Sequence, residues 1–325
     1  MALDAAQLQL DLAAVGAAGM AATDLDRPYA APEPGSVIRV GVSRQAAGEA
    51  LDRFDILLTT ASAPLRPWVA VDDLDAALGR LSARITAQPV AAAVAAQVLR
   101  MTLQLGFDEA LALESLAYSM LLASDGFRAW RAATPPRDRP EAPGARVAIA
   151  VGEAIGIRLT RPARRNAFDA RMRDELVEAL EFAAAHPDAP PVVLTGEGPS
   201  FSAGGDLDEF GSAADVGWAH LIRTARSPAR LVHGLGDRLT ARLHGACVGA
   251  GIEVSAAAAQ VTAQPGAVFR LPEVSMGLIP GAGGTASIPR RIGRQRACFM
   301  AIMGGDIDLD TALAWGLIDA IEPAS

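Results

Sequence analysis

Residues 240–259 read TARLHGACVGAGIEVSAAAA, and this stretch decides the fold class. A short apolar run ends in a glycine turn, and an alanine-rich run of helical character follows. PPVVLTGEG (190–198) is likewise a short apolar run that ends in a glycine turn. RVAIAVGEAIGIRLT (146–160) predicts two short strands joined by a turn, and apolar spacing predicts a helix over 168–186. Because strand, turn and helix recur, the sequence predicts an α/β architecture with helices packed on sheets.

A boundary lies at AATPPRDRPEAPGA (132–145), whose four prolines disfavour a helix and remove backbone donors. We interpret it as a Pro-rich linker. The segment after it, 146–325, would form a core. The segment before it, 61–131, would form a helical region, with residues 72–131 mostly helical.

The first 60 residues are expected to form an N-terminal extension of unknown role. Residues 1–35 are rich in alanine and then in proline, which predicts a loosely attached helix and tail. Segment 37–60, VIRVGVSRQAAGEALDRFDILLTT, predicts strand, helix, strand.

Composition excludes several classes of protein. The net charge is −8 and the chain has no lysine, so all 29 basic residues are arginine. An acidic balance argues against nucleic acid as a partner. No run reaches the roughly 18 apolar residues of a membrane span, and the start lacks the positive flank of a signal peptide, so we expect a cytoplasmic protein. Cys247 and Cys298 lie in apolar segments without metal-ligand spacing and are expected to be core thiols.

Three glycine-rich turns offer backbone N–H groups for chemistry. They are FSAGGD (201–206), HGACVGAG (244–251) and GLIPGAGG (277–284). Glycine lets the backbone approach a ligand, and an N–H at the start of a helix favours negative charge. Two such turns that face each other would form an oxyanion hole. A single glycine turn more often only reverses the chain, and none of the three matches a dinucleotide-binding fingerprint.

Two glutamates interrupt apolar, glycine-rich sequence. Glu253 lies in GIEVSAAAA and Glu273 lies twenty residues later in RLPEVSMGLIPGAGG. An isolated glutamate is usually exposed at a helix edge or a turn. If two carboxylates share a pocket that is largely shielded from water, their pKa values are pushed apart. One can then act as a general base while the other acts as a general acid.

Other polar residues fit structural roles better. His244 is expected to pack rather than catalyse, and no G-x-S-x-G nucleophile elbow occurs. Asp206, Asp208 and Glu209 are expected to be acids in the first turn of a helix.

Several motifs together resemble the crotonase superfamily of enoyl-CoA hydratases and isomerases, over residues 147 to about 323. RPARRNAFD resembles the family's early R-P-x-x-x-N-A element, and FSAGGDLDEF and HGACVGAGIEVSAAAA resemble its two oxyanion-hole elements. LPEVSMGLIPGAGGTASIPRRIG and DTALAWGLIDAIEP resemble its later motifs. The resemblance implies a spiral of repeated ββα units with an additional helical region.

The resemblance also implies roles for individual residues. Glu253 and Glu273 would be catalytic, and the backbone N–H groups of Gly205 and Ala250 would hold the thioester oxygen. Coenzyme A contacts would fall to Arg164, Arg165 and Ala203. The implied reaction is the reversible hydration of a 2-enoyl-CoA thioester, with no metal and no cofactor apart from the coenzyme A of the substrate.

Alternatives remain open within this resemblance. A Δ3–Δ2 enoyl-CoA isomerase of the family needs only the second glutamate, and the same fold also hosts thioester hydrolases and decarboxylases. A catalytically inactive acyl-CoA-binding protein is the alternative from another class. Partners are expected to be the acyl-CoA and further copies of the chain, in a trimer or a dimer of trimers, with neither nucleic acid nor membrane.

The order of the segments differs from the family pattern. Residues 72–131 resemble the helical tail that follows the core in the family, with A-x-x-I-x-x-x-P-x-A-A followed by A-L-x-x-E-x-x-x-Y-x-x-L-L. We therefore expect a rearranged architecture in which tail-like helices precede the core and pack against the segment after Pro280.

Overall fold

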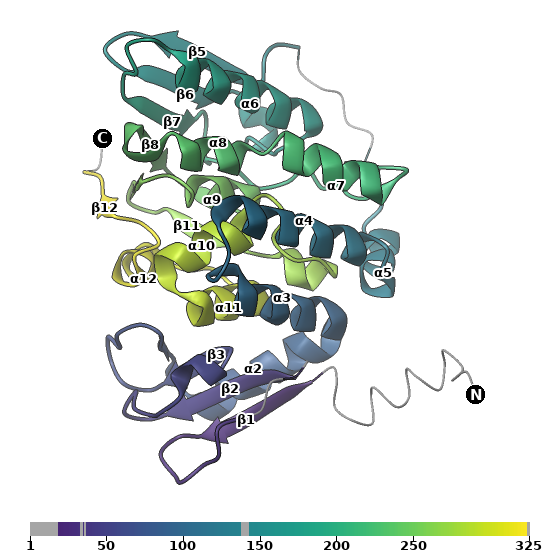
Figure 1. The fold of residues 1–325 in the computed structure, drawn as a ribbon, viewed down its shortest axis with the longest axis vertical. Helices are drawn as coiled ribbons and strands as arrows, with labels where there is room; N and C mark the ends of the chain where they lie inside the picture. The colour runs from purple at the N-terminus through teal and green to yellow at the C-terminus, as the bar shows by residue number, and fades with distance from the viewer. Residues whose placement is uncertain (1–18, 33–34, 36, 138–142, 324–325) are drawn as a thin grey trace.

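The computed structural model describes residues 19–32, 35, 37–137 and 143–323. The molecule is elongated, with a four-stranded sheet near one end of its long axis and a six-stranded sheet toward the other (Figure 1). The last helices of the chain lie between the two sheets, although every strand of the two sheets except β12 precedes them in sequence. Segments far apart in the sequence therefore share one core.

The four-stranded sheet is parallel, and its strands follow one another in chain order. Ile38, Val40 and Ile56 face the main core of the molecule, whereas Leu57 joins a smaller cluster with Trp68 on the other side. This alternation is the period of two that a strand requires. The strands are β1 (Met20–Asp24), β2 (Ile38–Ser43), β3 (Ile56–Thr59) and β4 (Val69–Ala70).

The prediction of strand, helix, strand over 37–60 is wrong in its middle part. Between β2 and β3 the chain forms a loop that contains only a 3-10 helix, η1 (Leu51–Arg53). Ala46 and Ala50 there have φ of 55° and 47°. A helix needs negative φ at each position, so these two residues prevent one. The loosely attached helix and tail predicted over residues 1–35 is wrong at Met20–Asp24, which form β1 and pair with β2. Residues 1–18 of that segment lie outside the described residues.

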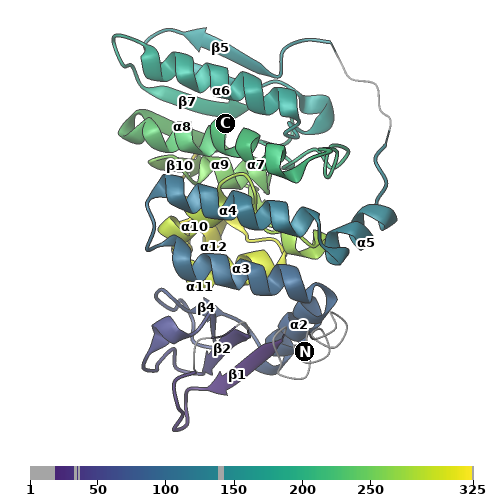
Figure 2. The same cartoon turned by 45° about the vertical axis from the view of Figure 1, so that its right-hand side comes forward.

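The helices predicted within 72–131 are confirmed. Asp73 caps the first one by accepting from the N–H of Ala76, Pro89 begins the second, and Ser124 caps the fourth. The second and third of these helices pack against helices near the C-terminus (Figure 2). The four are α2 (Leu74–Ala87), α3 (Pro89–Thr102), α4 (Phe107–Leu122) and α5 (Asp125–Ala133).

The six-stranded sheet has the order β12-β10-β8-β7-β6-β5. β5 and β6 form the predicted antiparallel pair, and the other neighbours are parallel. Leu239, Ala241 and Leu243 of the central strand β8 are fully buried. The strands are β5 (Val147–Val151), β6 (Ile155–Leu159), β7 (Val192–Gly196), β8 (Leu239–Leu243), β10 (Gln260–Ala263) and β12 (Ala320–Ile321).

A second, shorter layer of strands gives the fold its spiral. β9 (Ala246–Val248) follows β8 directly and pairs with β11 (Val268–Arg270), which follows β10. Ser202, which follows β7, forms a bridge with Cys247 in the same layer. The chain therefore passes from a long strand to a short one and then to a helix, repeatedly.

The helices of the core cover this spiral. The predicted helix over 168–186 is confirmed as α6, while α9 is shorter than predicted because residues 256–259 form turns and bends. Both cysteines are buried free thiols. The helices are α6 (Ala170–Ala185), α7 (Val216–Ala225), α8 (Pro228–Gly234), α9 (Ala250–Ser255), α10 (Gly284–Ile292), α11 (Arg294–Met303) and α12 (Leu309–Trp315). The remaining 3-10 helices are η2 (Pro162–Arg164), η3 (Gly236–Arg238) and η4 (Glu273–Met276).

Among the described residues, no helix combines the length and the apolar character that crossing a bilayer requires.

Candidate active site

Two glycine turns lie side by side at the centre of the spiral. The N–H of Val248 donates to the carbonyl of Ser202 (3.0 Å), and a Cβ on Gly204 would lie 2.8 Å from the Val248 oxygen. Only glycine allows this approach. The N–H groups of Gly205 and Ala250 donate to no other described residue. Ala250 is the first residue of α9, where an N–H has no partner within the helix. Both groups are therefore available to a ligand.

Glu253 is held within α9. Its side chain is buried, and one carboxylate oxygen, Oε2, accepts from the N–H groups of Ala282 (2.7 Å) and Gly284 (3.0 Å). The other oxygen, Oε1, lies toward Gly249: a Cβ on that glycine would be 3.7 Å away. Backbone donors thus fix one oxygen and leave the other facing the glycine turn.

Glu273 begins η4 and approaches the same glycine. A Cβ on Gly249 would lie 2.4 Å from Glu273 Oε1, and Gly249 has φ of +48°. The carboxylates of Glu253 and Glu273 therefore converge beside the residue that precedes Ala250. Glu273 Oε2 is buried and has no hydrogen-bond partner among the described residues.

The two carboxyl groups have different proton affinities. Burial raises the pKa of Glu253, while the N–H groups of Ala282 and Gly284 act in the opposite direction. Burial raises the pKa of Glu273 well above its ordinary value, and the charge on Glu253 raises it further. Because Glu273 lacks the donors that Glu253 has, Glu253 ionises first and Glu273 keeps its proton. The pair can offer a base and an acid together.

A third buried glutamate, Glu114, lies next to this pair and was missed as a site residue in the sequence. It lies on α4 and accepts from the N–H groups of Gly283 and Thr285 (both 2.7 Å) and from the Thr285 hydroxyl (2.8 Å). The signal in the sequence was that Glu114 is the one acid on a side of the predicted helix that is otherwise formed by Phe107, Leu111, Tyr118 and Leu122. A lone acid in such a stripe needs a buried partner.

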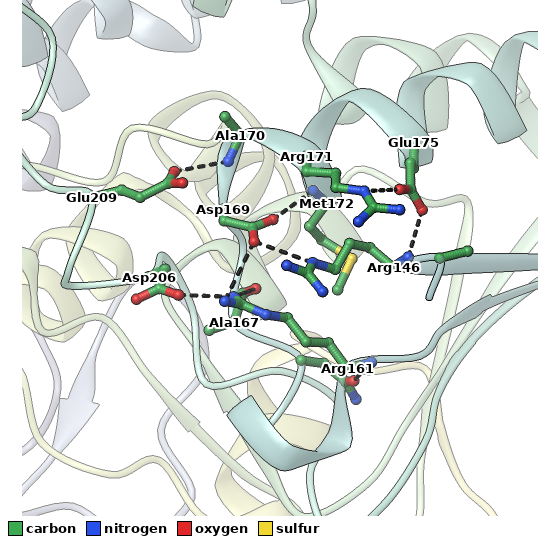
Figure 3. Close-up of polar contacts among 12 residues, drawn as sticks. Arg146, Arg161, Ala167, Asp169, Ala170, Arg171, Met172, Glu175, Asp206 and Glu209 are labelled. Carbon is green, nitrogen blue, oxygen red and sulfur yellow. Dashed lines mark hydrogen bonds and ion pairs between the residues drawn. The ribbon is translucent and has the colours of Figure 1, made fainter. Parts of the chain in front are cut away.

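The glycine turn at 201–206 is braced by a network of ion pairs (Figure 3). Arg161 pairs with Asp206 (2.8 Å) and with Asp169 (3.3 Å), and Arg146 also pairs with Asp169 (3.2 Å). Asp169 in turn caps α6 by accepting from the N–H of Met172. Asp206 directly follows Gly205, so this network fixes the position of the Gly205 N–H.

The prediction that Asp206, Asp208 and Glu209 begin a helix is wrong. Residues 207–211 form turns, and Asp206 is buried against Arg161. Glu209 accepts from the N–H of Ala170 (2.8 Å). Asp206 and Asp208 instead pair with Arg161 and Arg164 of the RPARRN element.

The predicted coenzyme A residues lie together beside the first turn. The N–H of Ala203 donates to the carbonyl of Arg165 (2.8 Å). The Arg165 side chain is exposed and forms no ion pair within the described residues. Arg164 is partly buried and pairs with Asp208 (3.8 Å). Arg165 is therefore the better placed of the two arginines to meet a phosphate.

Two further expectations concern histidine and metal. His244 lies 2.9 Å from the Gly198 carbonyl through Nε2, which suits a packing role. Within the described ranges, no three His, Cys, Asp or Glu side chains are arranged to hold a metal ion.

Comparison with known proteins places this geometry in a family. The profile of the family described as enoyl-CoA hydratase/isomerase matches residues 151–325. A mevalonyl-coenzyme A hydratase of Beauveria bassiana is 33% identical over 175 residues, covering 51% of this chain and 62% of the relative. A 2,3-dehydroadipyl-CoA hydratase of Escherichia coli is 35% identical over 168 residues, covering 51% and 64%. The chain thus spans less than two thirds of the length of these relatives.

Solved structures agree with this assignment. A crystal structure of enoyl-CoA hydratase from Thermoplasma volcanium has a TM-score of 0.52 and 31% identity, over 56% of this chain and 73% of that one. An enoyl-CoA hydratase from Bacillus anthracis has a TM-score of 0.51 and 29% identity, over 55% and 70%. The predicted crotonase-like α/β fold is confirmed. With a family profile that matches more than half of its residues, the chain belongs to the enoyl-CoA hydratase/isomerase family.

Proposed function

We propose that this protein catalyses the reversible hydration of a 2-enoyl-CoA thioester. The observation that carries the proposal is the convergence of Glu253 and Glu273 beside Gly249, one residue before the available N–H of Ala250. Named relatives act as hydratases of CoA thioesters, which supports the substrate class. No metal or further cofactor is required by this chemistry.

The mechanism follows from the different environments of the two acids. The thioester carbonyl oxygen would accept from the N–H groups of Gly205 and Ala250, which stabilise the enolate as it forms. Ionised Glu253 takes a proton from a water that attacks C3, and protonated Glu273 delivers a proton to C2. The water thus adds OH to C3 and the net proton to C2. Each oxyanion donor lowers the barrier by about 2.7–4 kcal/mol.

Hydration of crotonyl-CoA, followed by loss of the enoyl absorbance, tests this proposal. Glu253→Gln is a clean probe because Oε2 alone accepts both backbone donors, so a glutamine carbonyl can replace it without loss of either bond. We expect Glu253→Gln and Glu273→Gln each to reduce kcat by about 10²- to 10⁴-fold. An isomerase would instead interconvert 3-enoyl and 2-enoyl thioesters and would tolerate the change at position 253 in that reaction. A binding protein would carry out neither reaction, even as wild type.

We also propose that residues 72–131 take the place of the family's helical tail. In support, α4 packs on α10, and Glu114 contacts Gly283 and Thr285, which follow Pro280. The N-terminal sheet would then be an addition to the family core, and residues 132–145 would be the connection between the two parts.

We also propose that the protein is cytoplasmic and that copies of the chain associate with one another. Several large apolar side chains are exposed on the adjoining helices α4 and α7, namely Leu116, Met120, Trp218, Leu221 and Ile222. An apolar surface of this kind is typical of an interface. We therefore propose a trimer or a dimer of trimers, which sedimentation velocity measures directly.

A further inference from the structure

Four consecutive backbone N–H groups are divided between two buried glutamates. The N–H groups of Ala282 and Gly284 donate to Glu253, and those of Gly283 and Thr285 donate to Glu114. The donors alternate along the turn, so the two carboxylates hold it from opposite sides. Residues 282–285, the clamped turn, also form the start of α10.

Glu114 reaches the clamped turn from a distant part of the sequence. It lies on α4, 169 residues before Gly283. Its Oε1 accepts from Gly283, and its Oε2 accepts from both the N–H and the hydroxyl of Thr285. Two of the three neighbours are backbone N–H groups, which can only donate, and the third is a hydroxyl, so both carboxyl oxygens of Glu114 are engaged. A second contact from the same helical region, the Thr102 hydroxyl donating to the Thr285 carbonyl (2.7 Å), fixes the same residue.

We propose that Glu114 is a positioning residue for the reaction, which rests on the hydratase function proposed above. By holding Gly283 and Thr285, it fixes the clamped turn, and the clamped turn fixes Oε2 of Glu253 through Ala282 and Gly284. Oε1 of Glu253 is thereby kept toward Glu273. The helical region would thus contribute to catalysis without touching the substrate.

The charge of Glu114 also acts on the catalytic pair. The charged and titratable groups around Glu114 are Glu253 on α9, Glu273 on η4, Tyr118 on α4 and Arg223 on α7. Among them, only Arg223 is basic, and it stacks on the Tyr118 ring at 4.8 Å. After burial and the charge on Glu253, the charge on Glu114 is a further cause that raises the pKa of Glu273. Burial and the charge on Glu253 raise the pKa of Glu114 itself to about 8. Removing Glu114 therefore lowers the pKa of Glu273 in the pH range where Glu114 is ionised.

The test compares Glu114→Gln with Glu109→Gln, an exposed glutamate on the same helix. We expect Glu114→Gln to lower kcat for crotonyl-CoA hydration by about 10- to 100-fold with little change in KM, since small displacements of catalytic groups have effects of this size. The alkaline limb of the pH profile of kcat should move to lower pH, because Glu273 must be protonated to act as the acid. Glu109→Gln should match wild type in both respects.

A merely structural Glu114 would give another pattern. Loss of stability with an unmoved pH profile, or a kcat equal to that of Glu109→Gln, would overturn the proposal. Should Glu114→Gln fail to fold, Thr285→Val removes one donor and keeps the side chain's shape. The pKa of Glu114 then rises, less of it is charged, and the same limb should move in the same direction.

A measurement that does not depend on catalysis can test the role of Glu114 independently of the proposed hydratase function. Infrared spectra across pH follow the carbonyl stretch of protonated carboxyl groups. In Glu114→Gln, the bands that remain should titrate at lower pH than in wild type. Bands that titrate unchanged would contradict the positioning role, whether or not the wild type hydrates crotonyl-CoA. A wild type without turnover would contradict only the proposed function.

Discussion

At the scale of single residues, the most costly group in the site is Glu273. Its carboxyl is buried, and its Oε2 has no hydrogen-bond partner within the described chain. A buried polar atom without a partner reduces stability by about 1–3 kcal/mol. Glu253, by contrast, has two backbone donors on one oxygen. The burial that makes Glu273 a proton donor therefore also reduces the stability of the folded protein.

Glu273→Gln should therefore stabilise the protein as it inactivates it. The pKa of Glu273 is raised in the folded state, so its stabilising contribution is complete below the ordinary value of 4.5 and is lost as pH rises. We expect a gain in the free energy of unfolding at pH 8 that is smaller at pH 5, because glutamine cannot ionise in the buried site as pH rises, whereas Glu273 can. Urea denaturation at both pH values measures it. Exposed Glu153→Gln is the control, and a variant that follows wild type at both pH values would contradict the argument.

At the scale of elements, the turn before α9 determines how closely the two acids approach. Gly249 has a φ of +48°, and a Cβ added to it would lie 2.4 Å from Glu273 Oε1. Any side chain there would displace the acid as well as strain the backbone. Both the backbone conformation and the close approach of Glu273 therefore require glycine at position 249.

Gly249→Ala should lower kcat by on the order of 100-fold, because Glu273 must move away from the substrate. Gly266→Ala is a control with a positive φ as well, +82°, but an added Cβ there meets nothing within 4 Å. Both variants should lose stability, and only the first should lose activity. Equal kcat values in the two variants would show that Glu273 is not where we place it.

At the scale of the whole molecule, a buried charge cluster joins the N-terminal sheet to the helices. Asp55, just before β3, lies 2.6 Å from Arg100 of α3, 3.4 Å from Arg39 of β2 and 3.6 Å from Arg294 of α11. These arginines come from three separate parts of the chain. One acid therefore ties the sheet to both the helical region and the core.

Asp55→Asn should cost about 3–5 kcal/mol, since it leaves buried arginines without their counter-ion. Hydrogen exchange compared between Asp55→Asn and wild type should show the loss of stability first in the backbone amides of β2 and β3. Asp52→Asn, at an exposed position three residues earlier, should change stability by no more than about 0.5 kcal/mol. If both variants unfold alike, the cluster does not hold the sheet in place.

The sequence predicted the elements with regular periodicity better than their connections. The strands of 146–160 and the helices of 72–131 follow from spacing alone. The loop between β2 and β3 does not, because Ala46 and Ala50 adopt a left-handed φ that alanine rarely shows.

Contacts between distant segments explain what the sequence could not predict in the site. Glu253 and Glu273 were candidates because each interrupts an apolar run. Asp206 was misassigned because its partner, Arg161, is 45 residues away, and the role of Glu114 depends on a turn 169 residues away. Pairings of that range are set by packing of the whole chain, so a local pattern can indicate that an acid is buried but not which residue it pairs with.

The central claim is that Glu253 and Glu273 work as one unit beside the oxyanion turns. The most direct test is kcat for crotonyl-CoA hydration in Glu253→Gln, Glu273→Gln and the double variant. Residues that act together have non-additive effects. We predict that the double variant is no slower than the slower single variant, within about threefold. Losses that multiply in the double variant would contradict a shared water and separate the two acids.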